Sequence, residues 1–192
     1  MTFTSGYELS TALTNLMIFI VSFYGIFKIK NNKLWKMFFI LMSIDSLLGF
    51  IVHGFVMTLT TNIILWIILS IFFTITVNTL LVIFLKTKTK YIFILSIILA
   101  IVLLLEMYFG IDFIFTFTMY VLLTLIISVY KLYKSKIKDK KLYYLAFISE
   151  LTGGVLMLSK IKFLGLNHNG YCHIFLAISM LLFLIRVTKK NS

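Results

Sequence analysis

The chain of 192 residues contains no proline, a single cysteine and only six acidic residues. Without proline, its helices should lack proline kinks, which leaves Gly153-Gly154 as the expected soft point of one helix. A single cysteine, Cys172, excludes an intramolecular disulfide. Charged residues make up 12% of the chain, too few to cover the surface of a soluble domain of this length. The scarcity of charge therefore excludes an ordinary water-soluble protein.

The chain is rich in apolar residues: 61% of it is hydrophobic, with a mean hydropathy of +1.10. A bilayer core needs about 20 apolar residues per helix. Seven runs meet or approach that length: Leu9–Phe27, Met37–Leu59, Ile63–Leu85, Tyr91–Phe109, Phe113–Tyr130, Leu142–Leu158 and Tyr171–Ile185. The last run is short, so we expect its helix to begin nearer Asn167 or Asn169. The sequence predicts an all-α integral membrane protein, one domain over residues 1–192.

The basic residues lie almost entirely on one side of these runs. Sixteen of the 18 Lys and Arg residues follow the first, third, fifth and seventh runs, and only Lys160 and Lys162 lie on the other side. The positive-inside rule then predicts a seven-transmembrane-helix bundle, N-terminus outside and C-terminus cytoplasmic, multi-pass in a cytoplasmic (inner) membrane. Membrane lipids are the expected partners, and the net charge of +12 does not indicate nucleic acid.

Two further features concern the ends and loops of the predicted bundle. The N-terminal stretch MTFTSGYELS lacks the basic region of a cleaved signal peptide, so we expect the first run to be retained. The basic tract Lys131–Lys141 is interpreted as an ordinary cytoplasmic loop. A patch that binds anionic lipid is the alternative.

Polar side chains inside the predicted spans form two layers when depth is counted at about 1.5 Å per residue. The outer layer holds Glu8, Asn15, His53, Asn169 and His173. Helical spacing places three pairs of polar residues each on one face of its own helix. The pairs are Glu8 with Asn15, Ser46 with His53, and Asn169 with His173. The inner layer holds Asp45, Asn78 and Glu150. We interpret the inner layer as an interhelical hydrogen-bond cluster, at about 0.6–2 kcal/mol per contact, because an ionised carboxylate in lipid is costly.

The two outer histidines are candidate metal ligands. Imidazole is a common metal ligand near neutral pH, and His53 and His173 come from separate helices at similar depth. A metal site would combine them with Asn169; hydrogen-bonded structural histidines are the alternative. Zinc sites prefer three protein ligands and a water. His168 is a weaker candidate, because its side chain points about 100° away from that of Asn169 on a helix.

Three segments carry a resemblance: YELSTALTN, LWKMFF…LLGFIVHGF and LNHNGYCHIFLAI. They resemble a group of bacterial seven-helix proteins whose layout is similar to the ceramidase-like superfamily. That superfamily includes alkaline ceramidases, progestin and adiponectin receptors, and GPI-lipid remodelling proteins. The resemblance implies a zinc ion held by histidines of the second and seventh helices, where an activated water attacks a lipid amide or ester.

Carried over to this chain, the resemblance gives His53 and His173 the roles of zinc ligands. Asn169 stands where a further histidine would be, and Gly49 stands where the superfamily has a serine. Asn167 falls where some members have an aspartate. These departures imply a partly degenerate metal site.

The first functional prediction is a ceramidase-like, metal-dependent hydrolase of a lipid amide or ester. Its Zn²⁺ would be bound by His53, His173 and Asn169, and the supporting residues would be Glu8, Asn15, Ser46, Asn167 and His168. The second is a non-enzymatic membrane protein that binds or senses a lipid or supports a partner, with the same residues forming a hydrogen-bond cluster. A transporter is a third reading, suggested only by Glu150 beside Gly153-Gly154.

Overall fold

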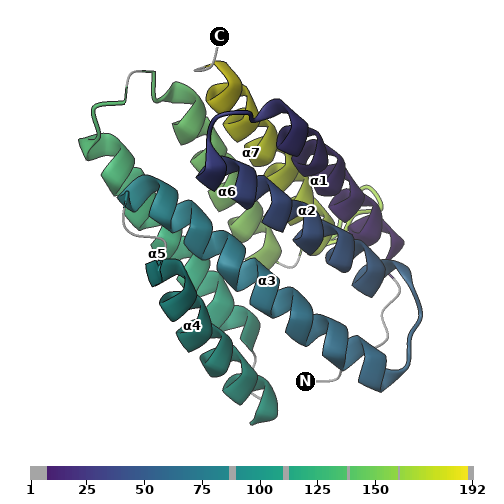
Figure 1. Cartoon of the computed structure of the whole chain (residues 1–192). Helices are drawn as coiled ribbons and strands as arrows, with labels where there is room; N and C mark the ends of the chain where they lie inside the picture. The colour runs from purple at the N-terminus through teal and green to yellow at the C-terminus, as the bar shows by residue number, and fades with distance from the viewer. Residues whose placement is uncertain (1–7, 87–89, 110–112, 138, 160, 190–192) are drawn as a thin grey trace. The chain divides into compact units, whose positions relative to one another are not determined.

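The computed structural model describes residues 8–86, 90–109, 113–137, 139–159 and 161–189. These residues form seven α-helices and no β-strand beyond one isolated bridge, which confirms the predicted all-α class and helix count (Figure 1). The helices are α1 (Leu9–Lys28), α2 (Lys33–Gly54), α3 (Leu59–Leu85), α4 (Lys90–Tyr108), α5 (Phe113–Lys134), α6 (Lys141–Leu158) and α7 (His168–Lys189).

Two helix ends show how long-range contacts set boundaries. Helix α7 begins at His168, where the polar stretch led us to expect it. Helix α2 ends at Gly54, so the predicted second span, which ran to Leu59, was wrong at that end. The carbonyl of His53 accepts a hydrogen bond of 2.9 Å from the Glu8 amide, and Thr58 caps the start of α3. Both contacts favour two separate helices over one continuous segment.

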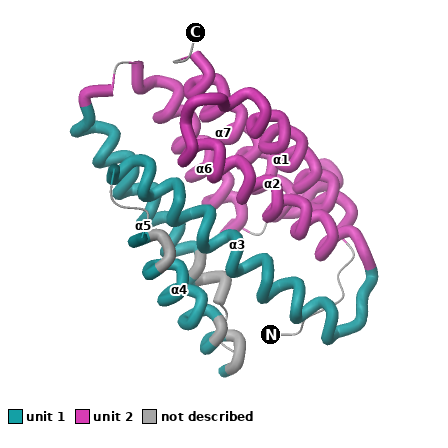
Figure 2. The backbone as a smooth tube through the Cα atoms, viewed as in Figure 1, with its two compact units in different colours: residues 1–6, 56–135 teal, residues 7–55, 136–192 magenta. Residues whose placement is uncertain are grey.

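The chain forms two compact units, coloured separately in Figure 2. The four-helix unit comprises the described parts of Tyr7–Phe55 and Lys136–Ser192, with α1, α2, α6 and α7. The three-helix unit contains α3, α4 and α5 within Val56–Ser135. The single domain over residues 1–192 stays a prediction.

Small residues and aromatic rings pack the four-helix unit, in which α1 contacts α2 and α7, and α6 contacts α7. A Cβ atom on Gly25 would lie 2.5 Å from Phe39 Cδ1, so glycine permits the close approach of α1 and α2. The Trp35 and Phe183 ring centroids lie 5.3 Å apart, and the Trp35 ring stacks on Tyr143. These contacts form a buried aromatic core below the polar ends of the helices.

Helix α1 is polar inside and apolar outside. Its buried residues are Thr11, Ala12, Thr14, Asn15, Ile18, Ser22 and Gly25, whereas its exposed large side chains are Leu13, Met17, Ile20, Phe23, Tyr24 and Phe27. Water-soluble helices show the reverse arrangement, while small and polar residues at helix interfaces are typical of helices in lipid. Five of the described helices, α1, α2, α3, α6 and α7, are long and apolar enough to cross a membrane.

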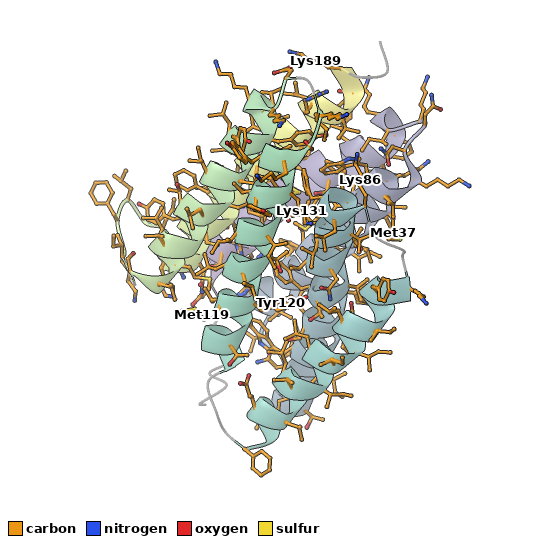
Figure 3. All side chains as sticks on the ribbon, turned by 90° about the vertical axis from the view of Figure 1, so that its left-hand side faces the viewer. Met37, Lys86, Met119, Tyr120, Lys131 and Lys189 are labelled. Atoms are coloured by element: carbon orange, nitrogen blue, oxygen red, sulfur yellow. The ribbon has the colours of Figure 1, made fainter. Side chains whose placement is uncertain are left out.

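One amide joins the helices of the three-helix unit. Asn78 on α3 donates from Nδ2 to Ser96 Oγ on α4 at 2.9 Å. Tyr120 on α5, labelled in Figure 3, donates its hydroxyl proton to Asn78 Oδ1. Thr116 also donates to Glu106 Oε1 at 2.6 Å, which adds a direct polar contact between α5 and α4.

Candidate functional site

Three helix ends of the four-helix unit meet at a polar cluster. Glu8 directly precedes α1, His53 is the second-last residue of α2, and Asn167 directly precedes α7. The hydrogen bond from the Glu8 amide to the His53 carbonyl fixes the start of α1 against the end of α2. Asn167 Oδ1 accepts the Gly170 amide proton at 2.8 Å, which is the geometry of an N-cap and fixes the start of α7.

The Glu8 carboxylate is the centre of this cluster. Its Oε2 atom lies 2.8 Å from Thr11 Oγ1 and accepts a hydrogen bond of 2.8 Å from Asn167 Nδ2. The same oxygen lies 3.8 Å from His53 Nδ1. The cluster therefore joins α1, α2 and α7 through one carboxylate.

The charge state of Glu8 follows from these neighbours. Burial alone would raise the pKa of Glu8, but hydrogen bonds from Thr11 and Asn167, the nearby His53 and a bond with Asn169 together hold it below its usual value. Its side chain keeps 36% of its surface exposed. Glu8 is therefore ionised at neutral pH and acts as an acceptor of hydrogen bonds.

Thr14 lies beside one ring nitrogen of His173. Thr14 Oγ1 lies 3.0 Å from both the Ser10 and the Thr11 carbonyl oxygens, which receive its own proton. Its oxygen is 3.3 Å from His173 Nδ1 and would accept the proton of a ring protonated at Nδ1. In that tautomer the lone pair of His173 is on Nε2, the form in which a neutral imidazole binds a metal while its other nitrogen donates to an oxygen.

The two predicted metal ligands lie close together. The ring centroids of His53 and His173 are 6.4 Å apart, with an interplanar angle of 63°. Two imidazoles on one zinc at about 2.0–2.1 Å have centroids about 5 Å apart, so the rings need to approach by about 1 Å. In each ring Nδ1 faces an oxygen: Glu8 Oε2 lies 3.8 Å from His53 Nδ1, and Thr14 Oγ1 lies 3.3 Å from His173 Nδ1.

Two imidazoles and an amide are the side chains of this cluster that could hold a metal. Within the described ranges, no three His, Cys, Asp or Glu side chains gather as a metal would require. Asn169, one turn before His173, contributes to the lowered pKa of Glu8 and so lies near that carboxylate. A zinc ion bound by both histidines and the Asn169 amide oxygen stays a prediction.

Three further predicted residues have different surroundings. Asn15 donates from Nδ2 to the Thr11 carbonyl at 3.1 Å, and its Oδ1 packs where a Cβ of Gly49 would lie, at 2.7 Å. Ser46 donates to the Met42 carbonyl of its own helix at 2.7 Å, a local bond rather than one to the cluster.

The third of these is His168. Its buried Nδ1 has no hydrogen-bond partner within the described part of the chain. That His168 is a weaker candidate metal ligand stays a prediction. Asn15 therefore lies at the α1–α2 contact beneath the cluster, and Ser46 and His168 make no hydrogen bond to it among the described residues.

The inner polar layer divides between the two units. Glu150 on α6 accepts a hydrogen bond of 2.9 Å from Ser179 Oγ on α7, and Asp45 is buried in α2. Asn78 belongs to the three-helix unit, where its amide bonds Ser96 and Tyr120. Two of the predicted residues thus bond across helices, while a cluster of all three stays a prediction.

Residues 10–192 match the model of a family of unknown function (DUF6962), and the chain belongs to that family. Comparisons with curated proteins and with solved structures gave no significant match. The family description assigns no activity, so a functional argument depends on the geometry of the cluster. The resemblance to the ceramidase-like superfamily stays a prediction.

Proposed function

We propose that this DUF6962 member is an integral membrane protein with seven spans, its N-terminus outside and its C-terminus in the cytoplasm. Five long apolar helices, the outward apolar face of α1 and the one-sided basic residues support this arrangement. A Cys172→Ser background with Asn31→Cys or Lys162→Cys tests the orientation in intact cells. A membrane-impermeant maleimide should label the second variant and leave the first unlabelled until the cells are opened. The opposite pattern would overturn the orientation.

For the polar cluster we propose metal-dependent hydrolysis of a lipid amide or ester. The observation that carries this proposal is the approach of two imidazoles whose Nδ1 atoms both face oxygens. A zinc ion bound by His53, His173 and Asn169 would supply a Lewis acid and an activated water. Because the helices present apolar side chains outward, the carbonyl compound that reaches such a cluster from the side is a lipid.

The remaining residues of the cluster would orient these ligands. Thr14 keeps His173 in the Nδ1-protonated form, and Glu8 holds a negative charge beside the His53 ring. Asn167 and Thr11 fix the Glu8 carboxylate in turn. Replacing a residue that hydrogen-bonds a metal ligand lowers metal affinity or activity by about 10–100-fold.

The Thr14 contact gives a sharp test of this arrangement. Thr14→Val removes the acceptor for the His173 proton with little change in shape, while Thr14→Ser retains the hydroxyl. Zinc affinity, measured by competition with a fluorescent chelator, should fall about 10–100-fold in the first variant and stay near wild type in the second. Equal affinities in both variants would contradict the proposed role of Thr14.

Hydrolysis itself is tested in vesicles that contain a fluorescent ceramide or a fluorescent phospholipid. We expect wild-type protein to release the labelled fatty acid, a chelator to stop the release, and His53→Ala and His173→Ala to abolish it. His168→Ala is the matched control, because that histidine makes no hydrogen bond to the cluster in the described structure. Release that survives in His53→Ala and His173→Ala would refute the proposed site.

The second candidate function is a non-enzymatic protein that binds or senses a lipid. The observation that favours it is the hydrogen-bond network itself, since Glu8 bonds the His53 carbonyl of α2 and the Asn167 amide at the start of α7. Buried networks of this kind fix helix register. Stoichiometric lipid that copurifies with metal-free, inactive protein would support this function over hydrolysis.

A further inference from the structure

The connection between α6 and α7 contains a tight hairpin with an apolar tip. Phe163 and Leu166 exchange two backbone hydrogen bonds of 3.0 Å each, and the central residues Leu164 and Gly165 have φ values of 49° and 77°. Positive φ at both central positions is the pattern of a type I′ turn. We call residues 161–166 the apolar hairpin, because Ile161, Phe163 and Leu164 are 46%, 64% and 81% exposed.

Contacts with α7 fix the apolar hairpin beside the polar cluster. Tyr171 on α7 donates its hydroxyl proton to the Phe163 carbonyl at 2.7 Å. Leu166 Cδ2 packs beside Gly170, 3.2 Å from where a Cβ of that glycine would lie. The next residue, Asn167, caps α7 and bonds Glu8. The exposed tip therefore has a fixed position relative to the cluster.

The residues at the tip are unusually apolar for an exposed turn. Type I′ turns favour Asn, Asp or Gly at their central positions, because a left-handed conformation is unfavourable for a residue such as leucine. This chain nevertheless keeps Leu164 there, with Phe163 beside it. Lys162, also exposed, lies between these residues and Ile161. Apolar side chains around a long basic one are typical of a segment at the boundary between lipid headgroups and acyl chains.

We propose that the apolar hairpin inserts its tip into the outer leaflet, with Lys162 extended to the lipid phosphates. The inserted tip fixes the depth of the polar cluster at the level of the headgroup–acyl boundary. Lipid amide and ester linkages lie at that level, so the hairpin brings the cluster to its substrate. The insertion rests on the membrane-spanning arrangement and orientation proposed above and does not depend on a metal, whereas the delivery of substrate rests on the proposed hydrolysis.

Depth-dependent fluorescence quenching tests the insertion. In a Cys172→Ser background, Leu164→Cys is labelled with an environment-sensitive fluorophore and reconstituted into phosphatidylcholine–phosphatidylglycerol vesicles. The vesicles carry nitroxide lipids with the spin label on the headgroup, near the top of the acyl chain, or near its end. Ile20→Cys, 59% exposed in the middle of α1, is the reference for a position deep in the acyl chains. Asn31→Cys, exposed between α1 and α2, is the aqueous reference.

We expect the upper acyl-chain nitroxide to quench the Leu164→Cys probe at least twofold more than the Asn31→Cys probe. Phe163→Cys should give the same result and replaces Leu164→Cys if that variant does not fold. Quenching at both hairpin positions no greater than at Asn31, together with strong deep quenching at Ile20, would overturn the insertion and leave the spans intact. Loss of quenching at Ile20 as well would overturn the membrane proposal itself.

Discussion

Asn167→Asp changes one amide into a carboxylate at the centre of the polar cluster. The Oδ1 acceptor for the Gly170 amide is retained, but the Nδ2 donor that now bonds Glu8 at 2.8 Å is lost. A hydrogen bond to a charged group contributes about 1.5–3 kcal/mol. Repulsion between two carboxylates at about 4 Å ranges from about 1 kcal/mol in water to about 4 kcal/mol near a protein surface. Because Glu8 is 36% exposed, the lower values apply, and we expect a loss of about 2–4 kcal/mol at pH 7.

The pH dependence distinguishes this mechanism from a simple packing defect. In wild-type protein the pKa of Glu8 is lowered by its neighbours, so its stabilising effect is present above the unfolded value of 4.5 and is lost as the pH falls through the folded value. In Asn167→Asp a like charge raises the pKa of one carboxyl group. Stability should then fall as the pH rises above the ordinary range of carboxyl groups, the opposite slope to that of wild type.

The assay is equilibrium unfolding in mixed detergent micelles between pH 4 and pH 8, followed by far-ultraviolet circular dichroism. Asn32→Asp is the matched control, since Asn32 also caps a helix, accepting from the Trp35 amide at 3.2 Å. No carboxylate is bonded to Asn32 in the described structure, so that variant should differ from wild type by less than about 1 kcal/mol. An Asn167→Asp protein with the stability and pH slope of wild type would refute the assigned network.

Three substitutions test contacts within the separate units. Gly49→Ala would place a Cβ 2.7 Å from Asn15 Oδ1 and should lower the free energy of unfolding by about 1–3 kcal/mol. Gly154→Ala, with nothing within 4 Å of the new atom, should be neutral or stabilising in the same detergent titration, and equal losses in both variants would contradict the α1–α2 contact. Tyr120→Phe leaves Asn78 Oδ1 without its phenol donor and should cost about 0.6–2 kcal/mol by thermal unfolding, whereas an unchanged melting temperature would contradict that bond.

The sequence is most informative about helices and least informative about how their ends meet. Apolar runs predict all seven helices, and the amides at the start of the last helix place its beginning near His168. The end of α2 could not be predicted, because it depends on the Glu8 amide, 45 positions away in the chain from the His53 carbonyl that it bonds. Local patterns contain no information about such a contact.

The cluster shows the same division. Depth and spacing brought His53, His173 and Glu8 into one predicted layer, and the structure places them together. Thr14 was not identified as a candidate, since a threonine hydroxyl in an apolar helix commonly bonds its own backbone, as this one also does. Its position three residues after Thr11 on a buried face was the only available indication.

The metal content of detergent-purified protein tests the central claim most directly. Wild type should contain about one zinc ion per chain after purification with zinc supplied, measured by mass spectrometry of the digested protein. His53→Ala and His173→Ala should each lose the metal, and His168→Ala should retain it. Wild-type protein without metal, or metal retained in both of the first two variants, would contradict a metal site in the polar cluster.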